Sequence, residues 1–340
     1  MRPVLGIETS CDETAAAVLG PDGTVLSELV LSQRGHAAFG GVVPEIAARA
    51  HLAHLPGLVA EAMAAAGLDF ADLEAVAATA GPGLIGGLIV GSSFAKGVTI
   101  ARGLKFLAIN HLEAHALTAR LTDDVTFPYL SLLVSGGHCQ CVLVEGVGRY
   151  RRLGGTIDDA VGEAFDKVGK LLGLGWPGGP AVERLAAGGD ARRVALPRPL
   201  LGRAGCDFSF SGLKTAVAQL VARYPAGALP GPDAADIAAG FQAAVADVMA
   251  DRARHAMAMA PEARTLVVAG GVAANAAVRN ALAGAAAHAD VAFVAPPLRW
   301  CGDNAVMVAW AGIERLRASA TADGLDFAPR PRWPLESLAP

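Results

Sequence analysis

The sequence predicts an α/β protein built from two similar lobes with a ligand cleft between them. The chain has 340 residues, of which 53% are apolar and 18% are charged. This length suits two cores of roughly 100–200 residues each, and the composition is typical of a compact enzyme rather than of a disordered chain. A strand–turn–strand–strand–helix pattern, followed by strand–glycine–helix, occurs twice. Duplicated units of this kind place a ligand site between them.

The first copy of the pattern begins almost at the amino terminus. Its expected strands are short apolar runs bounded by turn residues, and they span residues 4–8, 14–19, 24–31 and 73–80. Its expected helices carry apolar side chains at helical spacing, and they span residues 41–66 and 88–102. A glycine-rich turn joins the last of these strands to the second helix.

One segment of this half raises the question of a membrane span. Residues 75–95 contain no charged side chain and are long enough to cross a bilayer. Pro82 and five glycines interrupt the segment, and because such residues break a continuous helix, a strand, a turn and a helix are favoured. The start of the chain shows no secretory signal, and five scattered cysteines without a CxxC pair argue against a disulfide framework or a zinc knuckle. We therefore expect a cytoplasmic protein.

The second copy of the pattern fills the rest of the chain. Its expected strands span residues 129–135, 139–144, 150–153, 265–269 and 291–295. Its expected helices span residues 157–172, 209–222, 237–259 and 274–284. The residues after Phe327 include four prolines and are expected to form a tail that wraps over the surface.

The net charge of −4 gives little electrostatic attraction for nucleic acid, so it does not favour a protein that binds nucleic acid without a partner. Small arginine groups are present, either as solvated loop charges or as local contacts for an anion: Arg149, Arg151 and Arg152; Arg192 and Arg193; Arg198 and Arg203. If RNA is the substrate, the chain needs help to hold it.

Two histidines give the sharpest local signal. His111 and His115 are four residues apart, so on a helix they project from one face and can share a metal ion. The same spacing also arises by chance among surface or core histidines. Glu113 lies about 200° around the helix from His111. It is therefore badly placed to act as the base of an HExxH protease.

A third ligand would have to come from elsewhere, and Asp303 is the best candidate. Two imidazoles and one carboxylate with open positions suit Fe(II), with zinc as the second choice. The alternative role for Asp303 is the N-cap of a helix over residues 305–316. The residues alone leave both roles open.

Three glycine turns are able to cradle a phosphate or a nucleoside because their backbone N–H groups can converge on an anion. They are Ser135-Gly136-Gly137-His138, Gly178-Gly179-Pro180 and Gly270-Gly271-Val272. No P-loop motif is present. Residues 81–86 and 173–178 both spell GxGxxG, but neither has the context of a dinucleotide site.

Acidic residues form a further group of candidates. Asp12 and Glu13 lie in the first hairpin turn, where they would orient a nucleophile or polarise a leaving group; the alternative is an ordinary acidic turn. The charged residues of the predicted helix over residues 157–172 include Asp158, Asp159, Glu163, Asp166 and Lys167. Glu163 and Lys167 form an i,i+4 pair, and the seven-residue spacing puts Asp159 and Asp166 on one face.

Taken together, these motifs resemble the TsaD/Kae family of tRNA threonylcarbamoyladenosine synthesis proteins, formerly labelled O-sialoglycoprotein endopeptidases. The resemblance runs from Val4 to about Ala311. It rests on an ordered set of strings: GIETSCDETAAAV, GGVVPEIAARAH, TAGPGLIGGL, NHLEAHAL, LLVSGGHCQ, DDAVGEAFDKVGKLLGLGWPGGP, FSFSGLKTAV, VVAGGVAANAAVR and CGDNAVM. Two local departures stand beside site positions, where the family often has Thr in place of Cys139 and of Gly302.

The resemblance implies an actin-like (ASKHA) duplicated two-lobe fold with a central cleft. Its lobes would span residues 1–110 and 111–304, with the metal and nucleotide sites in the second lobe. The helix over residues 305–320 is a candidate to return to the first lobe, and residues 321–340 would form a tail. It implies one metal ion per subunit, usually iron, held by His111, His115 and Asp303. It also implies a substrate site lined by Val134, Ser135, Gly136, Gly137, His138, Asp166, Gly179, Glu183 and Asn275. In this site Asp166 and Glu183 would accept hydrogen bonds from ribose hydroxyls.

The activity that the resemblance implies is acyl transfer to RNA. The chain would move the threonylcarbamoyl group from threonylcarbamoyl-AMP to N6 of adenine 37 in tRNAs that decode ANN codons, with Asp12 or Glu13 assisting proton transfer. The implied partners are a smaller paralogue of the same fold (TsaB-like) and a P-loop ATPase (TsaE-like). The competing hypotheses are a metal-dependent glycoprotease, a sugar kinase or other ATPase of the same fold, and a scaffold without activity.

Overall fold

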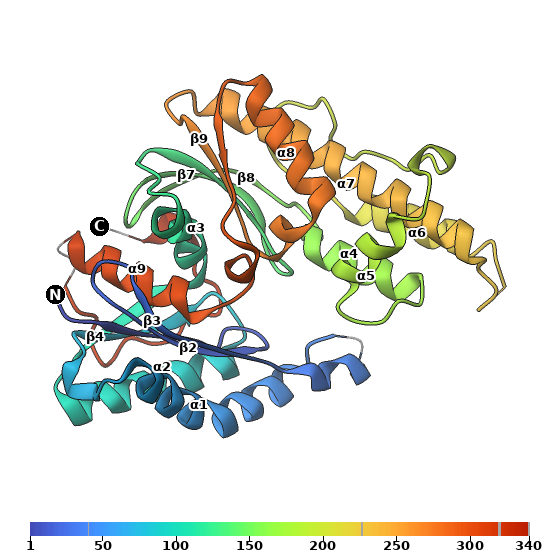
Figure 1. The fold of residues 1–340 in the computed structure, drawn as a ribbon. Helices are drawn as coiled ribbons and strands as arrows, with labels where there is room; N and C mark the ends of the chain where they lie inside the picture. Colours follow the sequence, from blue (N-terminus) through green and yellow to red (C-terminus); the bar gives the residue numbers. More distant parts are fainter. Residues whose placement is uncertain (40, 226, 319–320, 339–340) are drawn as a thin grey trace. The chain divides into compact units, whose positions relative to one another are not determined.

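The computed structural model describes residues 1–39, 41–225, 227–318 and 321–338. The chain forms two compact units (Figure 1), and each is described by itself. The first unit comprises Met1–Asp124, Gly146–Tyr150 and Gly302–Pro340. The second unit comprises Val125–Glu145 and Arg151–Cys301.

A five-stranded sheet forms the centre of the first unit. Its strands are β1 (Val4–Glu8), β2 (Glu13–Leu19), β3 (Val25–Ser32), β4 (Ala75–Gly81) and β5 (Lys105–Asn110), in the order β3-β2-β1-β4-β5. β1 is antiparallel to β2 and parallel to β4, and β4 is parallel to β5. β1 and β4 are buried throughout, so they read as continuous apolar runs without alternation.

Helices cover both faces of this sheet (Figure 1). They are α1 (Pro44–Ala66) and α2 (Ile85–Arg102) on one face, and α3 (His111–Thr122) and α9 (Ala305–Arg317) on the other. The uncharged stretch over residues 75–95 is divided between β4 and α2, as the sequence predicted. Among the residues that the structure describes, no helix has both the length and the hydrophobicity to span a membrane.

The second unit repeats the sheet of the first. Its strands are β6 (Tyr129–Val134), β7 (Cys139–Gly146), β8 (Arg149–Gly155), β9 (Thr265–Ala269) and β10 (Ala292–Val294), in the order β10-β9-β6-β7-β8. Read from the other edge, this is the strand order of the first unit. β6 is antiparallel to β7 and parallel to β9, just as β1 is to β2 and β4. The predicted duplication is therefore confirmed.

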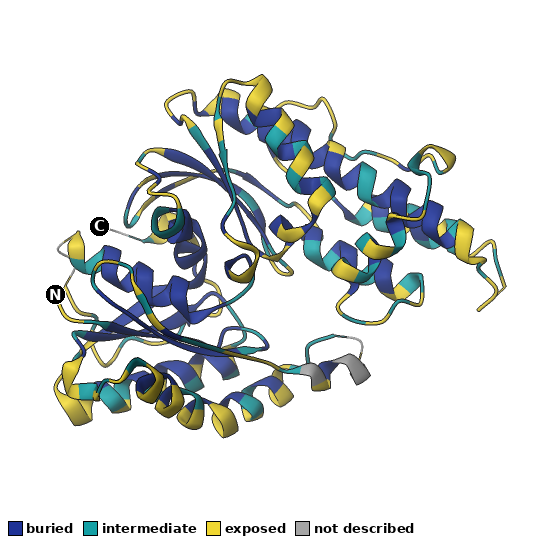
Figure 2. Ribbon diagram, in the orientation of Figure 1, coloured by how far each residue is buried: buried dark blue, intermediate teal, exposed yellow. Residues whose placement is uncertain are grey.

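Within its described residues, the second unit is completed by five α-helices: α4 (Val161–Leu171), α5 (Gly178–Ala186), α6 (Ser211–Val221), α7 (Gly231–Met259) and α8 (Ala276–His288). Short 3-10 helices connect elements in both units: η1 (Arg34–Phe39), η2 (Phe70–Asp72), η3 (Ala191–Arg193), η4 (Gly271–Ala274), η5 (Leu298–Trp300) and η6 (Leu335–Ser337). α7 is packed against α5 and α8, and most of its length is buried (Figure 2).

Each unit has its own hydrophobic core. In the first unit the core gathers Leu5, Ile7, Leu55, Val59 and Phe106 from the sheet and from α1. In the second unit it gathers Phe165, Phe208, Phe210, Phe241 and Val248. Helices packed on a sheet over a separate core are the layered arrangement expected of an independent α/β lobe.

The carboxyl-terminal tail is anchored in the first unit more firmly than a surface wrap. The Arg330 N–H donates to the Ala80 carbonyl at 2.7 Å, and the Gly83 N–H donates to the Pro331 carbonyl at 3.2 Å. Trp333 is 5% exposed and belongs to the core of this unit. The tail therefore runs along the end of β4, close to the start of α2.

The unit boundaries differ from the predicted lobes at 1–110 and 111–304. α3 lies in the first unit because it packs against α9, where the Trp310 indole N–H donates to the Leu117 carbonyl at 3.1 Å. α9 also lies in the first unit and ends at Arg317. Residues 319–320 of the predicted helix and 339–340 of the predicted tail fall outside the described residues.

The start of α4 corrects one prediction. The helix begins at Val161, so Asp158 and Asp159 precede it and do not share a helical face with Asp166. The Asp158 carboxylate instead accepts the N–H of Phe210 at 2.9 Å and the Ser211 hydroxyl at 2.7 Å. A side chain that binds the start of another helix draws the backbone away from helical geometry.

Candidate metal centre and nucleotide-binding turns

The first turn of α3 is fixed at the end of β5. Asn110 is the last residue of the strand and the N-cap of the helix, and its side-chain oxygen accepts the N–H groups of Leu112 at 2.9 Å and Glu113 at 3.3 Å. Its side-chain nitrogen donates to the carbonyl of Trp333 in the tail at 2.9 Å. The tail and the strand thus set the position from which His111 and His115 project.

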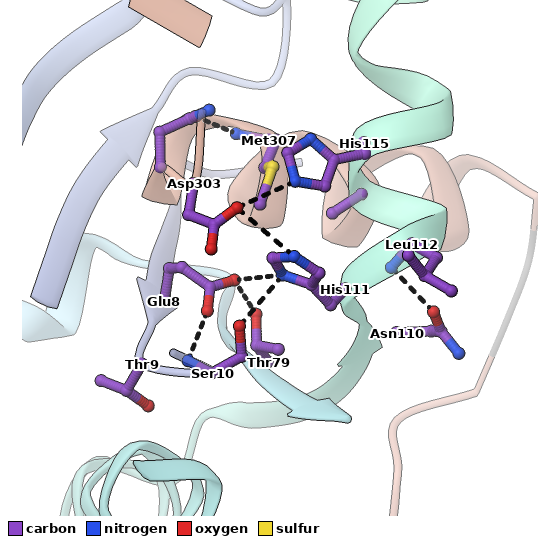
Figure 3. Close-up of polar contacts among 12 residues, drawn as sticks. Glu8, Thr9, Ser10, Thr79, Asn110, His111, Leu112, His115, Asp303 and Met307 are labelled. Carbon is purple, nitrogen blue, oxygen red and sulfur yellow. Dashed lines mark hydrogen bonds and ion pairs between the residues drawn. The ribbon is translucent and has the colours of Figure 1, made fainter. Parts of the chain in front are cut away.

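His111, His115 and Asp303 lie together within the first unit (Figure 3). One carboxylate oxygen of Asp303 is 3.1 Å from Nε2 of His115 and 3.4 Å from Nε2 of His111. Metal–nitrogen bonds of about 2.0–2.1 Å at tetrahedral or octahedral angles separate neighbouring ligand atoms by roughly 3.0–3.4 Å. The two distances from the Asp303 oxygen to the histidine nitrogens therefore match the spacing of ligands around one small ion.

Asp303 does not serve as a helix cap. The N-cap of α9 is Asn304, whose side-chain oxygen accepts the N–H of Met307 at 2.9 Å. The capping role that the sequence allowed for Asp303 therefore falls to the next residue. This leaves the Asp303 carboxylate to face the two imidazoles (Figure 3).

Glu8 holds the far side of the His111 ring. Its Oε2 is 3.0 Å from Nδ1 of His111 and accepts the Thr79 hydroxyl at 2.6 Å, while Oε1 accepts the Ser10 N–H at 2.6 Å. A carboxylate on the second nitrogen of a ligating histidine fixes the ring and raises its basicity. We did not predict this role of Glu8 from the sequence. The signal for it was a carboxylate at the end of a wholly buried strand.

The electrostatics of this group are set by burial and mutual charge. Burial opposes the charged form of each side chain, but attraction outweighs it. The carboxylates of Asp303 and Glu8 hold the pKa of His111 well above its usual range. In turn, His111 holds the pKa of Asp303 well below its usual range and lowers the pKa of Glu8. A divalent cation at Nε2 would take the place of a proton there.

The donor set fits a metal of the iron or zinc type. It offers two imidazole nitrogens and one carboxylate oxygen, all within 4.8 Å of one another. The Asp303 side chain keeps 19% of its surface exposed, whereas those of His111 and His115 keep 6% and 3%. An ion held here would therefore be approached from the Asp303 side.

Glu113 takes no part in this group. Its Oε1 accepts the Tyr150 hydroxyl at 2.8 Å and the Gly148 N–H at 3.2 Å, so it holds the turn between β7 and β8 against α3. Burial raises the pKa of this carboxyl. These bonds hold Glu113 at the turn, so Glu113 is not placed beside the two histidines as the glutamate of an HExxH protease is.

Asp12 and Glu13 follow β1 in the turn that the sequence singled out. The side chain of Asp12 is buried and that of Glu13 is half-buried. Burial, together with the negative charges of Asp303 and Asp12, raises the pKa of Glu13 to about 9. Glu13 therefore lies close enough to Asp303 for the charge of Asp303 to act on it.

In the second unit the predicted binding residues gather where β6 and β9 end. The Ser135 N–H donates to the His138 carbonyl at 2.8 Å, which closes a turn that exposes Gly136 and Gly137. Val134 is fully buried in the core, so it supports this turn from below. The Gly162 N–H at the start of α4 donates to the Ser135 carbonyl at 3.2 Å.

The glycine at the end of β9 has a specific reason to be glycine. Gly270 has a φ of 99°, and a Cβ there would lie 2.3 Å from the Val134 carbonyl oxygen. A side chain at this position would push apart the turns that follow β6 and β9. Gly271, the next residue, has open space around it.

Hydrogen bonds within the second unit hold the polar side chains of the remaining predicted residues. Asp166 accepts the Gly178 N–H at 2.8 Å, and Glu183 accepts the Ala276 N–H at 2.8 Å. Asn275 is the N-cap of α8 and also donates to Gln242 at 2.9 Å. Its amide is thus engaged within the protein. Gly179 lies at the start of α5 with only Phe165 within reach of a Cβ.

Comparison with known proteins agrees with the family resemblance found in the sequence motifs. Residues 24–310 match the family "tRNA N6-adenosine threonylcarbamoyltransferase" (TsaD). A protein of that name from Granulibacter bethesdensis is 69% identical, with 98% of this chain and 94% of that protein covered. Another from Gluconobacter oxydans is 64% identical, with 100% of this chain and 95% of that protein covered.

Solved structures with low sequence identity share the fold. The chain is similar to HypF of T. kodakarensis, with a TM-score of 0.61 and 15% identity over 94% of this chain and 48% of that one. It is also similar to component A of (R)-2-hydroxyglutaryl-CoA dehydratase from Acidaminococcus fermentans, with a TM-score of 0.54 and 16% identity over 94% and 100% of the two chains. The duplicated sheets and these likenesses show the actin-like (ASKHA) fold.

Proposed function

The chain belongs to the family of tRNA N6-adenosine threonylcarbamoyltransferases, and we propose that it transfers the threonylcarbamoyl group of threonylcarbamoyl-AMP to N6 of adenine 37 in tRNAs that decode ANN codons. The observation that carries this proposal is the family match over nearly the whole chain. The ordered histidine, aspartate and glycine-turn residues of the two units support it.

The reaction replaces one bond to the carbamoyl carbon by another. The N6 amine of adenine attacks that carbon, the bond from the carbon to the phosphate oxygen breaks, and AMP leaves. The amine loses one proton. The protein must therefore hold the adenylate, accept a proton and stabilise negative charge on the departing phosphate.

We assign the adenylate to the second unit. The exposed Gly136 and Gly137 offer backbone N–H groups to the phosphate, whose charge grows as the bond breaks. Asp166 and Glu183 use carboxylate oxygens to hold the neighbouring turns, and their other oxygens would accept ribose hydroxyls. The glycine turn would thus position the phosphate, and the two carboxylates would position the sugar.

We assign the metal and the proton acceptor to the first unit. His111, His115 and Asp303 would hold one iron ion, or zinc as the second choice. When bound, such an ion supplies Lewis-acid polarisation of a carbonyl or phosphate oxygen. Glu13, whose pKa is raised to about 9, keeps its proton at neutral pH. Asp12 is therefore the carboxylate that we assign as the proton acceptor.

Partners are a further part of the proposal. A net charge of −4 gives little attraction for tRNA, so a smaller paralogue of the same fold (TsaB-like) and a P-loop ATPase (TsaE-like) would assist binding and turnover in the cytoplasm. The glycoprotease hypothesis lacks a general base, because the Glu113 carboxylate accepts a hydrogen bond from the Tyr150 hydroxyl next to the turn between β7 and β8. The kinase hypothesis gives no role to the His111–His115–Asp303 group.

The test is identification of the product. A tRNA transcript that decodes an ANN codon is incubated with threonylcarbamoyl-AMP, this protein and its partners, and the digested nucleosides are analysed by mass spectrometry. We expect threonylcarbamoyladenosine with the unmodified transcript, and none with a transcript that carries guanosine at position 37. Modified nucleoside without this protein, or none with the full set, would contradict the proposal.

A further inference from the structure

A cavity of about 630 Å³ lies between α4 and α6 in the second unit. Its lining consists of Lys167, Lys170, Leu171, Lys214, Thr215 and Ala218. We call it the lysine cavity. The three lysines line the cavity together with the apolar side chains of Leu171 and Ala218, and none of these residues belongs to the predicted nucleotide site.

The lysines are concentrated here against the trend of the whole chain. The sequence has only five lysines but 23 arginines, and three of the five lysines line this one cavity. The other two are Lys96 and Lys105, both in the first unit. A lysine ammonium is a compact point charge with three donors, which suits a single phosphate oxygen.

A half-buried carboxylate, that of Asp159, holds two of these ammonium groups beside each other. Asp159 places one oxygen 3.2 Å from Nζ of Lys167 and the other 2.6 Å from Nζ of Lys214. Lys167 is also 2.6 Å from Glu163. Each ammonium has three donors, so Lys214 and Lys167 still have donors for an anion. Lys170 is exposed and makes no ion pair with any described residue.

The charges at the cavity leave a net positive field. Three lysines face two carboxylates, those of Asp159 and Glu163. The third carboxylate on this side, that of Asp158, is engaged with the start of α6 through Ser209, Phe210 and Ser211. In a chain of net charge −4, this is a local site at which a phosphate is attracted rather than repelled.

The cavity is next to the predicted nucleotide residues. Asp166 and Lys167 are consecutive on α4, so their side chains point about 100° apart around the helix. Asp166 binds Gly178 on α5, whereas Lys167 pairs with the carboxylate that also holds Lys214 on α6. The two sites therefore lie on adjacent faces of one helix. A tRNA whose adenine reaches the adenylate held at the first site has neighbouring phosphates within reach of the second.

We propose that the lysine cavity binds a backbone phosphate of tRNA close to the adenosine that is modified. The proposal rests on the proposed function for its substrate class and adds the surface that recognises it. Contacts to phosphates position a nucleic acid without reading its sequence, so the cavity would serve every tRNA substrate alike.

The test compares tRNA binding by wild type, Lys170→Gln and Lys170→Arg, with the partner proteins present, over a salt range of about 50–200 mM. Arg192→Gln, an exposed charge in the same unit, is the matched control. We expect Lys170→Gln to weaken tRNA binding several-fold and to lower the slope of log affinity against log salt by about 1. Lys170→Arg and the control should stay close to wild type, and the affinity for AMP should not change.

The other outcomes overturn the proposal. An unchanged salt slope in both Lys170→Gln and Lys214→Gln would show that no tRNA phosphate is bound here. Equal weakening of AMP or inorganic phosphate binding would assign the cavity to a small anion instead. Wild type that binds tRNA with the expected slope but transfers nothing would sink the proposed function and leave the cavity standing, so the two failures are distinguishable.

Discussion

The two units share one sheet topology but carry opposite chemistries at equivalent positions. In the first unit, the turn between β1 and β2 presents the carboxylates of Asp12 and Glu13. In the second unit, the equivalent turn between β6 and β7 presents the N–H groups of Gly136 and Gly137. One turn offers carboxyl groups and suits cations or protons, whereas the other offers backbone donors and suits anions.

The segments that follow the edge strands β5 and β10 also differ between the two units. β5 runs directly into α3, which supplies His111 and His115, whereas β10 is followed by Pro296, Pro297 and η5. The first site consists of side chains fixed by buried partners, and the second consists of turns fixed by glycines and caps. A duplicated frame can thus specialise through its turns while its sheets stay alike. Changes in the first unit should mainly affect metal binding, and changes in the second should mainly affect stability and the adenylate.

The largest effect is expected from a metal ligand. His115→Ala removes one of three donors, so we expect metal affinity to fall roughly 100-fold or more and purified protein to contain little iron or zinc. His54→Ala, an exposed histidine on α1, is the matched control. Metal content by mass spectrometry after identical purification decides the matter, and equal content in both variants would disprove the assignment.

The second-largest effect is expected from Glu8, the carboxylate that contacts the proposed metal ligand His111. Glu8→Gln keeps the size of the side chain but removes the charge beside Nδ1 of His111, so metal affinity should fall about 10–100-fold. Glu74→Gln, which alters a surface carboxylate of the same unit, should have no such effect. Competition with a chelator of known affinity measures both, and identical curves would refute a role for Glu8.

A glycine of the second unit should show the contrast in stability. Gly270→Ala forces a side chain against the Val134 carbonyl at a positive φ, and we expect it to lower the free energy of unfolding by about 1–3 kcal/mol. Gly271→Ala meets open space and should change little. Urea unfolding of the two variants is the measurement, and a similar loss in both would show that the turn is more pliable than described.

The two asparagine caps separate stability from metal binding. Asn110→Ala and Asn275→Ala each remove an N-cap, so each should cost about 1 kcal/mol of unfolding free energy. Only Asn110 precedes the helix that carries the candidate metal ligands His111 and His115, and only Asn110 contacts the tail at Trp333. Chelator competition should therefore show weaker metal binding in Asn110→Ala alone. Weaker binding in Asn275→Ala as well would remove the distinction between the units.

The smallest effect concerns pH. Burial opposes the charge of Asp158, but hydrogen bonds from Ser209, Ser211 and Phe210 outweigh it and lower its pKa. A lowered pKa means that this contribution to stability is present above the unfolded value of about 3.9 and is lost as pH falls below it. Urea midpoints between about pH 5 and pH 3 should therefore decline less in Asp158→Asn than in wild type. Parallel declines would contradict this.

Local patterns predicted most of the fold and part of the site. The strand over residues 265–269 and the duplicated order follow from apolar runs bounded by turn residues. β5 escaped notice because Asn110 ends the strand and caps α3 at once, without a turn between them. The pairing of His111 with Glu8 joins residues 103 positions apart, which no local spacing reveals. The residues alone offered Asp303 either as the third ligand or as a helix N-cap, and the family resemblance implied the ligand role.

The most direct test of the central claim is transfer of a labelled threonylcarbamoyl group from its adenylate to an ANN-decoding tRNA. Wild type and His111→Ala are assayed side by side with the partner proteins, after both are shown to be folded by circular dichroism. The account predicts rapid labelling of tRNA by wild type and loss of labelling in the variant. Labelling by His111→Ala at the wild-type rate would contradict a catalytic role for the metal group, and no labelling by wild type would contradict the proposed reaction itself.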